Sequence, residues 1–266
     1  MCDPEILRAV KDAGHPGRRA YRDIKTGGPL QRLERAIVGA QNVVDLTHAL
    51  HEDFPTYLGQ SQFHRRKQLR YSERGINIDT ITTSEHVGTH IDAPLHFSED
   101  GQAVDEIPIA SLIAPLCVVD IREKVSADAD AELTMDDLMM WTERYGAVPP
   151  NACVAMLSGW ASFVETARFR NADQAGVMHF PGIHPEVADY LLEETEAVGL
   201  AVDTLSLDKG ISRDFRTHRA WLPAGGWGLE CLASLDMVPA SGSTIMVGAP
   251  KHRGGTGGAA RAFALF

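Results

Sequence analysis

The sequence predicts a mixed α/β protein, with one α/β domain over residues 43–266 and a polar helical arm over residues 1–42. Two observations support this fold class. From residue 43 onward, short β-branched segments alternate with amphipathic segments of helical period, whereas residues 1–42 show helical spacing only. The chain also has no internal repeat and no low-complexity tract, so a single domain is the simplest arrangement.

The arm is predicted to be helical because its few apolar residues recur at helical spacing. A Gly-Gly pair at positions 27 and 28 interrupts this pattern and separates two segments. The apolar positions are Ile6, Val10, Leu30, Leu33 and Ile37.

Five segments of the domain are predicted to be strands. The first, VVDLTHAL at 43–50, alternates apolar and polar residues. The others are short and rich in β-branched residues, as interior strands are. They are CVVDI (117–121), ACVAML (152–157), LAVDTL (200–205) and TIMVGA (244–249).

Two segments between these strands are predicted to be helices. TMDDLMMWTERYG begins with Thr134 as an N-cap and has Asp137 three residues later, which is close to a capping box. HPEVADYLLEE has Pro185 at the first helical position.

The glycine-rich segment RGGTGGAAR, residues 253–261, superficially suggests a phosphate-binding loop. It lacks the GK[ST] ending of that motif, and no helix of useful length follows it. We therefore expect a turn between two terminal strands.

The charge and the cysteines narrow the class of protein. A formal charge of −11 disfavours nucleic acid as a partner, and no segment has the roughly 20 apolar residues of a membrane helix. The first residues lack the apolar region of a secretory signal, so we expect a cytoplasmic protein. The cysteines form no CxxC pair and are expected to be buried small hydrophobes. They are Cys2, Cys117, Cys153 and Cys231.

The segment SEHVGTHIDAPLHF, residues 84–97, is the strongest functional signal. It brings together His86, His90, Asp92 and His96. Imidazole and carboxylate groups together suit zinc, manganese or iron. The β-branched residues, Gly88 and the Ala-Pro pair favour extended or bent chain over helix. Because four residues of strand span roughly 13 Å, a bend at Gly88 is needed to bring His86 back toward Asp92.

Two further candidate ligands lie downstream. Glu230 stands in the otherwise apolar run GLECLASL, and His218 precedes it by twelve residues. A carboxylate in such a run is expected to be partly buried, and a buried charge needs a partner. A metal cation or an arginine would satisfy this need.

HVGTHIDAPLHF resembles the HxGTHxDxPxH signature of the metal-dependent hydrolase family that contains bacterial kynurenine formamidase, isatin hydrolase and cyclase-like proteins. The resemblance extends from Val43 to Phe266. It includes DLTHALHEDFPTY, FPGIHPEVADYL, VDTLSLD and MVGAPKHRGGTGGAAR. It implies a barrel-like mixed β core flanked by helices, and assembly as a homodimer or homotetramer. We expect the arm to pack across the subunit interface.

The resemblance also implies roles for individual residues. His86, His90 and Asp92 would bind a first metal ion, and His96 would be the catalytic acid/base. His218 and Glu230 would complete a second site, with Asp92 and Glu230 bridging. Since some isatin hydrolases with a single manganese ion lack the second acid, one or two ions per subunit are expected, either Mn²⁺ or Zn²⁺.

These residues favour hydrolysis of an amide or ester of a small aromatic substrate by water. We expect opening of a cyclic amide, isatin to isatinate; the alternatives are an arylformamidase acting on N-formylkynurenine, a lactone hydrolase, and a non-catalytic metal-binding scaffold subunit. Candidate substrate-binding aromatics are Phe54, Tyr57, Phe63 and Trp160. By resemblance, Tyr57 replaces the substrate-stacking tryptophan of formamidases.

Overall fold

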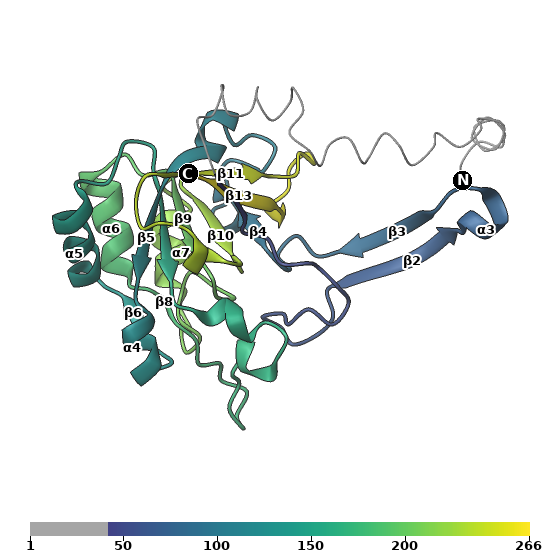
Figure 1. Cartoon of the computed structure of the whole chain (residues 1–266), viewed down its shortest axis with the longest axis horizontal. Coiled ribbons are helices and arrows are strands. Elements are labelled where there is room, and N and C mark those ends of the chain that lie inside the picture. The colour runs from purple at the N-terminus through teal and green to yellow at the C-terminus, as the bar shows by residue number, and fades with distance from the viewer. Residues whose placement is uncertain (1–41) are drawn as a thin grey trace.

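A strongly curled sheet forms the centre of the protein (Figure 1). The computed structural model describes residues 42–266, and within this range the sheet has nine strands in the order β1-β13-β11-β5-β7-β9-β10-β4-β12. Their bounds are Val43–Asp45 (β1), His90–Asp92 (β4), Ile113–Asp120 (β5), Cys153–Leu157 (β7), Gly199–Val202 (β9), Trp227–Glu230 (β10), Ser243–Gly248 (β11), Gly257–Ala259 (β12) and Arg261–Leu265 (β13). The expected barrel-like mixed core is confirmed as a half-barrel.

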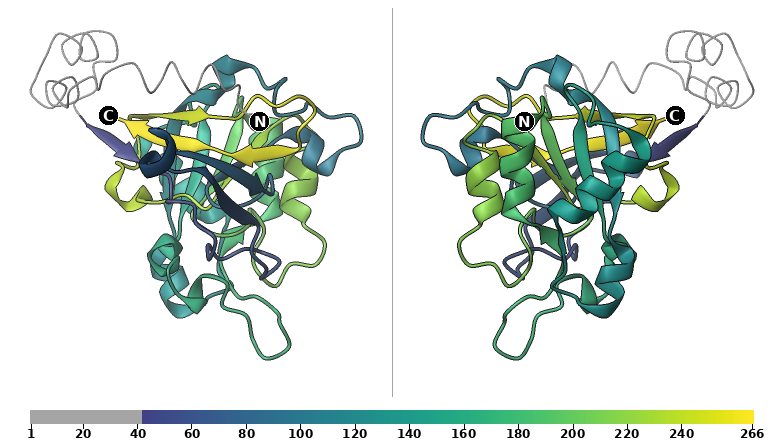
Figure 2. Two further views of the ribbon diagram at one scale, coloured as in Figure 1. Left: turned by 90° about the vertical axis from the view of Figure 1, so that its right-hand side faces the viewer. Right: turned by 90° about the vertical axis from the view of Figure 1, so that its left-hand side faces the viewer.

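The helices gather mainly on one face of this sheet (Figures 1 and 2). The α-helices are Tyr71–Arg74 (α3), Arg122–Ala127 (α4), Met135–Tyr145 (α5), Pro185–Glu194 (α6) and Arg216–Trp221 (α7). Short 3₁₀ helices cover Pro94–Phe97 (η2), Ile109–Leu112 (η3), Trp160–Phe163 (η4), Ala167–Phe169 (η5) and Leu235–Met237 (η6). Strands β6 (Glu132–Leu133) and β8 (Gly182–Ile183) form a separate parallel pair.

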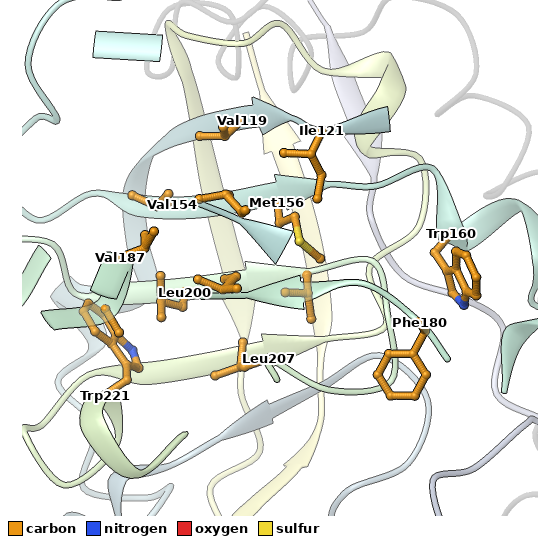
Figure 3. Close-up of a cluster of buried hydrophobic side chains, with 14 of the residues drawn as sticks. Val119, Ile121, Val154, Met156, Trp160, Phe180, Val187, Leu200, Leu207 and Trp221 are labelled. Atoms are coloured by element: carbon orange, nitrogen blue, oxygen red, sulfur yellow. The ribbon is translucent and has the colours of Figure 1, made fainter. Parts of the chain in front are cut away.

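The two faces of the sheet bury two different apolar clusters. Strands β5, β7, β9 and β10 run parallel, and the outer strands pair antiparallel. Along β7, Val154 and Met156 belong to the cluster under the helices (Figure 3), whereas Cys153 and Ala155 belong to the cluster on the opposite face. Because alternate side chains of a strand point to opposite faces, a strand covered on both sides is apolar throughout, as this one is.

Most of the predicted elements are confirmed. Strands β7 and β11 match their predicted segments to within one residue, and α6 begins at Pro185 as expected. Strand β5 contains most of the predicted segment 117–121 but begins earlier, at Ile113. Helix α5 also begins as predicted, since the Asp137 carboxylate accepts a hydrogen bond from the Thr134 backbone N–H at 2.7 Å.

Two predicted boundaries and one predicted turn are corrected. The strand predicted over 200–205 ends at Val202, because the Asp203 carboxylate accepts hydrogen bonds from the backbone N–H groups of Ser158 and Trp160 after β7. The strand predicted over 43–50 ends at Asp45, as β1. The second half of the glycine-rich segment forms β12, which pairs with β4, so this part is not a turn.

The pair β2 (Phe63–Leu69) and β3 (Ile78–Thr83) forms a hairpin that projects from the body (Figure 1). This hairpin is not predicted from the sequence, because its strands are largely exposed and lack an apolar face. The predicted N-terminal arm lies outside the described residues, except for Asn42. Within residues 42–266, no helix is both long and apolar enough to span a bilayer, and Cys117, Cys153 and Cys231 are buried free thiols as expected.

Candidate active site

The backbone bends at Gly88, as the spacing of the histidines requires. Gly88 has φ +68°, a conformation that side chains other than that of glycine rarely adopt. The bend returns the chain so that Nδ1 of His86 lies 2.7 Å from Oδ1 of Asp92. The next three residues form β4, in which His90 and Asp92 point to the same face. The predicted bend is therefore confirmed.

Two segments distant in sequence complete a cluster of polar side chains. Strand β10 lies antiparallel to β4, with Glu230 opposite His90, and α7 contributes His218. The Nε2 atom of His90 lies 3.4 Å from both Asp92 Oδ1 and Glu230 Oε2. The Nε2 atom of His218 lies 3.1 Å from Glu230 Oε1 and 3.6 Å from Asp92 Oδ2. The structure thus brings together all five residues predicted as ligands.

The ring nitrogens outside the cluster are held by hydrogen bonds. Nδ1 of His90 donates to the Gly88 carbonyl at 2.8 Å, and Nδ1 of His218 donates to the Asp208 carboxylate at 2.6 Å. Because a carbonyl and a carboxylate can only accept, these bonds assign the proton of each neutral ring to Nδ1. The lone pair of each Nε2 then faces the carboxylates of Asp92 and Glu230.

Such an arrangement requires positive charge at its centre. Lone pairs and carboxylate oxygens repel one another, and the buried Oδ2 of Asp92 has no hydrogen-bond partner among the described residues. Burial lowers the pKa of His90, but its hydrogen bond to Asp92 and the two carboxylate charges outweigh burial and raise the pKa to about 9. Burial raises the pKa of Asp92, but the imidazoles of His218, His86 and His90 hold it well below its usual range. The donor set therefore fits a divalent cation.

His96 lies beside this cluster on η2. Its ring stacks on that of His86, with centroids 3.8 Å apart, and it lines the cavity described below. Burial, together with the neighbouring histidines, lowers the pKa of His96 to about 4, so its imidazole is neutral at neutral pH. The side chains of His96, His86 and Asp92 also lie close enough to one another to hold a metal ion.

A cavity of about 370 Å³ opens above the cluster. Its floor includes His86, His90, His218 and Glu230, and most of its remaining lining is apolar. Tyr57, Phe97 and Phe215 supply aromatic walls, with the Phe215 ring 5.9 Å from each of the other two. The space therefore suits a small molecule with a flat apolar ring and a polar group directed at the floor.

Only one of the four aromatic residues predicted to contact substrate lines this cavity. Tyr57 does so, as expected. Phe54 and Trp160 are buried in the core under the helices, and the Trp160 indole N–H donates to the Phe169 carbonyl at 2.9 Å. Phe63 lies on β2, outside the lining. The rings of Phe54 and Trp160 therefore lie in the core and Phe63 stands on the hairpin, so these three residues do not line the cavity.

Three residues of the site were not predicted from the sequence. Phe97 directly follows His96, and this adjacency could have suggested it. Phe215 has φ +50°, which is uncommon for a bulky residue and is often found at functional sites, but no sequence signal reveals it. Asp208 lies in the VDTLSLD segment, ten residues before His218, and only the fold shows that the two side chains meet.

The fold and the site together define a class of protein: a mixed α/β domain with a half-barrel sheet and a buried histidine–carboxylate cluster in its cavity. The model of the family described as "Putative cyclase" matches residues 44–209, and the chain belongs to that family. The match includes the histidine segment and ends before His218 and Glu230.

Individual relatives agree with this assignment. Isatin hydrolase of Roseibium aggregatum is 34% identical over 195 residues, which cover 70% of this chain and 73% of that protein. Kynurenine formamidase of Bacillus cytotoxicus is 32% identical over 184 residues, covering 67% and 76%. The structure of isatin hydrolase A from Labrenzia aggregata bound to benzyl benzoate has a TM-score of 0.81 and 33% identity, and covers 90% of this chain and 99% of that one. The family resemblance seen in the sequence is confirmed, and the chain is a hydrolase.

Proposed function

We propose that this hydrolase opens a cyclic aromatic amide by cleaving its C–N bond, with isatin as substrate and isatinate as product. The observation that carries the proposal is the cavity itself, whose aromatic walls stand directly above the histidine–carboxylate cluster. The similarity to isatin hydrolase, in sequence and in structure, covers most of the chain and supports the same reaction.

The cluster would hold Mn²⁺ or Zn²⁺. By the family resemblance, His86, His90 and Asp92 would bind one ion, and His218 and Glu230 would bind a second together with Asp92. Two overlapping groups of these side chains lie close enough to hold an ion: His86, Asp92 and His96, and His90, Asp92 and Glu230. A bound ion would supply positive charge that polarises the amide carbonyl and makes water a better nucleophile at neutral pH. The rival arrangement has one ion, with His218 and Glu230 orienting substrate and water.

The residues of the chain have distinct tasks in this reaction. Tyr57, Phe97 and Phe215 hold the aromatic ring, so that the amide carbon faces the floor of the cavity. His96 takes a proton from the attacking water as the oxygen bonds to the carbonyl carbon. His96 then returns that proton to the amide nitrogen of the substrate as the C–N bond breaks. Its neutral imidazole, in contact with both the cavity and His86, suits this exchange.

A second candidate is arylformamidase activity on N-formylkynurenine. By the family resemblance, the twelve-residue spacing of His218 and Glu230 is that of the formamidases, and this spacing, together with the similarity to kynurenine formamidase, favours it. The bond chemistry is the same, but the substrate is linear, and Tyr57 in place of the expected tryptophan gives a smaller stacking surface. Hydrolysis of an aryl lactone would use the same groups.

A comparison of substrates tests the proposal. The purified protein would be analysed for metal and then assayed spectrophotometrically on isatin, N-formylkynurenine and an aryl lactone. We expect the highest kcat/KM on isatin, loss of activity after chelation, and recovery with Mn²⁺ or Zn²⁺. A higher kcat/KM on N-formylkynurenine would favour the second candidate, and full activity in metal-free protein would refute the metal assignment.

A further inference from the structure

The glycine-rich segment RGGTGGAAR has no role in the function proposed above, yet it lies against the candidate metal centre. Strand β12 pairs with β4, which places Gly257 opposite Asp92. The loop before β12 packs on the residues that precede the bend at Gly88, where Glu85 and His86 stand. A segment near the C-terminus therefore contacts a proposed ligand 170 positions away.

A chain of short hydrogen bonds connects this loop to His86. The Thr256 hydroxyl donates to Glu85 Oε2 at 2.6 Å, and the Thr256 backbone N–H donates to the same oxygen at 3.2 Å. The other oxygen of Glu85 lies 2.6 Å from Nε2 of His252, at the surface. On the inner side, the Thr256 hydroxyl lies 2.9 Å from Nε2 of His86.

The contact with Thr256 makes Nε2 of His86 a hydrogen-bond donor. A hydroxyl has a single hydrogen, and Thr256 uses it toward Glu85, which can only accept. Toward His86, Thr256 therefore acts as an acceptor, and Nε2 of His86 donates to it. The other ring nitrogen, Nδ1, lies 2.7 Å from Asp92 Oδ1 and points into the cluster. With its outer nitrogen held in this way, the ring of His86 could bind a metal ion through Nδ1.

The glycines on either side of Thr256 are needed for this close approach. A Cβ atom on Gly255 would lie 2.1 Å from Nε2 of His252 and 2.6 Å from Glu85 Oε1. A Cβ atom on Gly257 would lie 2.4 Å from the Ile91 carbonyl and 2.7 Å from the His86 ring. Side chains at these positions would push the loop away from Glu85 and His86. The steric demand explains Gly255 and Gly257 without a phosphate ligand.

We propose that Thr256, held by Glu85, is a positioning residue that orients the His86 ring for metal binding by accepting a hydrogen bond from its Nε2–H. This inference rests on the proposed function, because it assigns His86 as a ligand. Outer partners of metal-binding histidines typically contribute about 10–100-fold to metal affinity. Thr256→Val removes the hydroxyl at nearly constant shape, whereas Thr256→Ser keeps it.

The experiment compares these variants in metal binding, independently of catalysis. Metal-free full-length protein would be titrated with Mn²⁺ and with Zn²⁺ against a competing chelator. We expect about 10–100-fold weaker binding in Thr256→Val and near wild-type binding in Thr256→Ser. Thr195→Val is the matched control, since it removes a Thr side-chain bond to the Leu191 carbonyl at the end of α6. It should leave metal affinity unchanged.

A second readout is the hydrogen bond from Nε2–H of His86 to Thr256, observed by ¹⁵N NMR of the histidine rings in the Zn²⁺-loaded protein. We expect this N–H to exchange slowly with solvent in the wild type and in Thr256→Ser, and faster in Thr256→Val. Wild-type affinity in Thr256→Val, or an equal loss in Thr256→Ser, would overturn the inference while leaving the proposed function intact. A wild-type protein that binds neither ion would overturn both.

Discussion

Glu230 lies directly opposite His90 in the antiparallel pairing of β10 with β4, and its carboxylate is 3.4 Å from the His90 ring. The same carboxylate accepts a hydrogen bond from the Leu207 backbone N–H at 2.8 Å and approaches His218 at 3.1 Å. Glu230 thus connects the histidine segment to α7. Replacing this residue and counting the bound metal ions distinguishes a site with one ion from a site with two.

Replacing Glu230 with Gln is expected to remove one of two metal equivalents, because the amide loses the charge that a shared ligand supplies. The measurement is titration of metal-free protein with Mn²⁺ or Zn²⁺, following both bound metal and activity. Saturation of wild-type activity at one equivalent, with that equivalent still bound tightly by Glu230→Gln, would exclude the two-metal site.

Replacing Asp92 with Ala should remove most bound metal and nearly all activity, because its carboxylate faces three imidazoles at the centre of the cluster. The loss of affinity should exceed the ~10–100-fold effect of an outer partner. Metal analysis and a kinetic assay check this. The exposed Asp100→Ala is the control, and a variant at Asp92 that keeps its metal would show that the ion is bound elsewhere.

Replacing His96 with Asn should leave metal content near that of the wild type while kcat falls by about 10²–10⁴-fold, as for loss of a general acid/base. Paired metal and rate measurements are needed, with the exposed His64→Asn as the control. If metal and activity fall together, His96 is a ligand, which its position beside His86 and Asp92 also permits.

Replacing Asp208 with Asn should weaken metal binding by about 10–100-fold, because its carboxylate holds Nδ1 of His218 at 2.6 Å and so directs Nε2 into the cluster. Chelator competition measures the effect. Asp214, exposed and six residues further along the chain, provides the control variant Asp214→Asn. Equal affinities in the two variants would contradict an orienting role for Asp208.

Replacing Asp137 with Asn should lower the free energy of unfolding at pH 7 by about 1 kcal/mol, the usual value of a helix cap. Burial raises the pKa of Asp137, but hydrogen bonds from Lys124 and Thr134 outweigh burial and hold it below its usual range. A depressed pKa in the folded state means that the stabilisation is present above the pKa of the unfolded chain, about 3.9. It is lost as the pH falls through the folded value.

The difference between wild type and Asp137→Asn should therefore shrink in urea unfolding at progressively lower pH. The exposed Asp136→Asn, in the same helical turn, should show a smaller difference at pH 7. A difference that stays constant with pH would contradict the ionic part of this cap.

The sequence by itself determined the features that depend on neighbouring residues. The β-branched runs predicted β5, β7 and β11, because β-branched residues favour strands. In β7, which is covered on both faces, every position is apolar and buried. Gly88 predicted the bend that joins His86 to Asp92, since six residues of chain restrict where those side chains can meet. The histidine segment also identified the family by its resemblance to the family signature.

Only the tertiary structure decided which distant segments reach the site. The insertion of β10 between β9 and β4 places Glu230 against His90, and the pairing of β12 with β4 brings Thr256 to His86. The tertiary structure also places Phe215 in the lining of the cavity and Trp160 in the core. The physical reason is that strand order and register are set by packing over the whole sheet. Local propensity and periodicity report which residues form a strand, but not which strand becomes its neighbour.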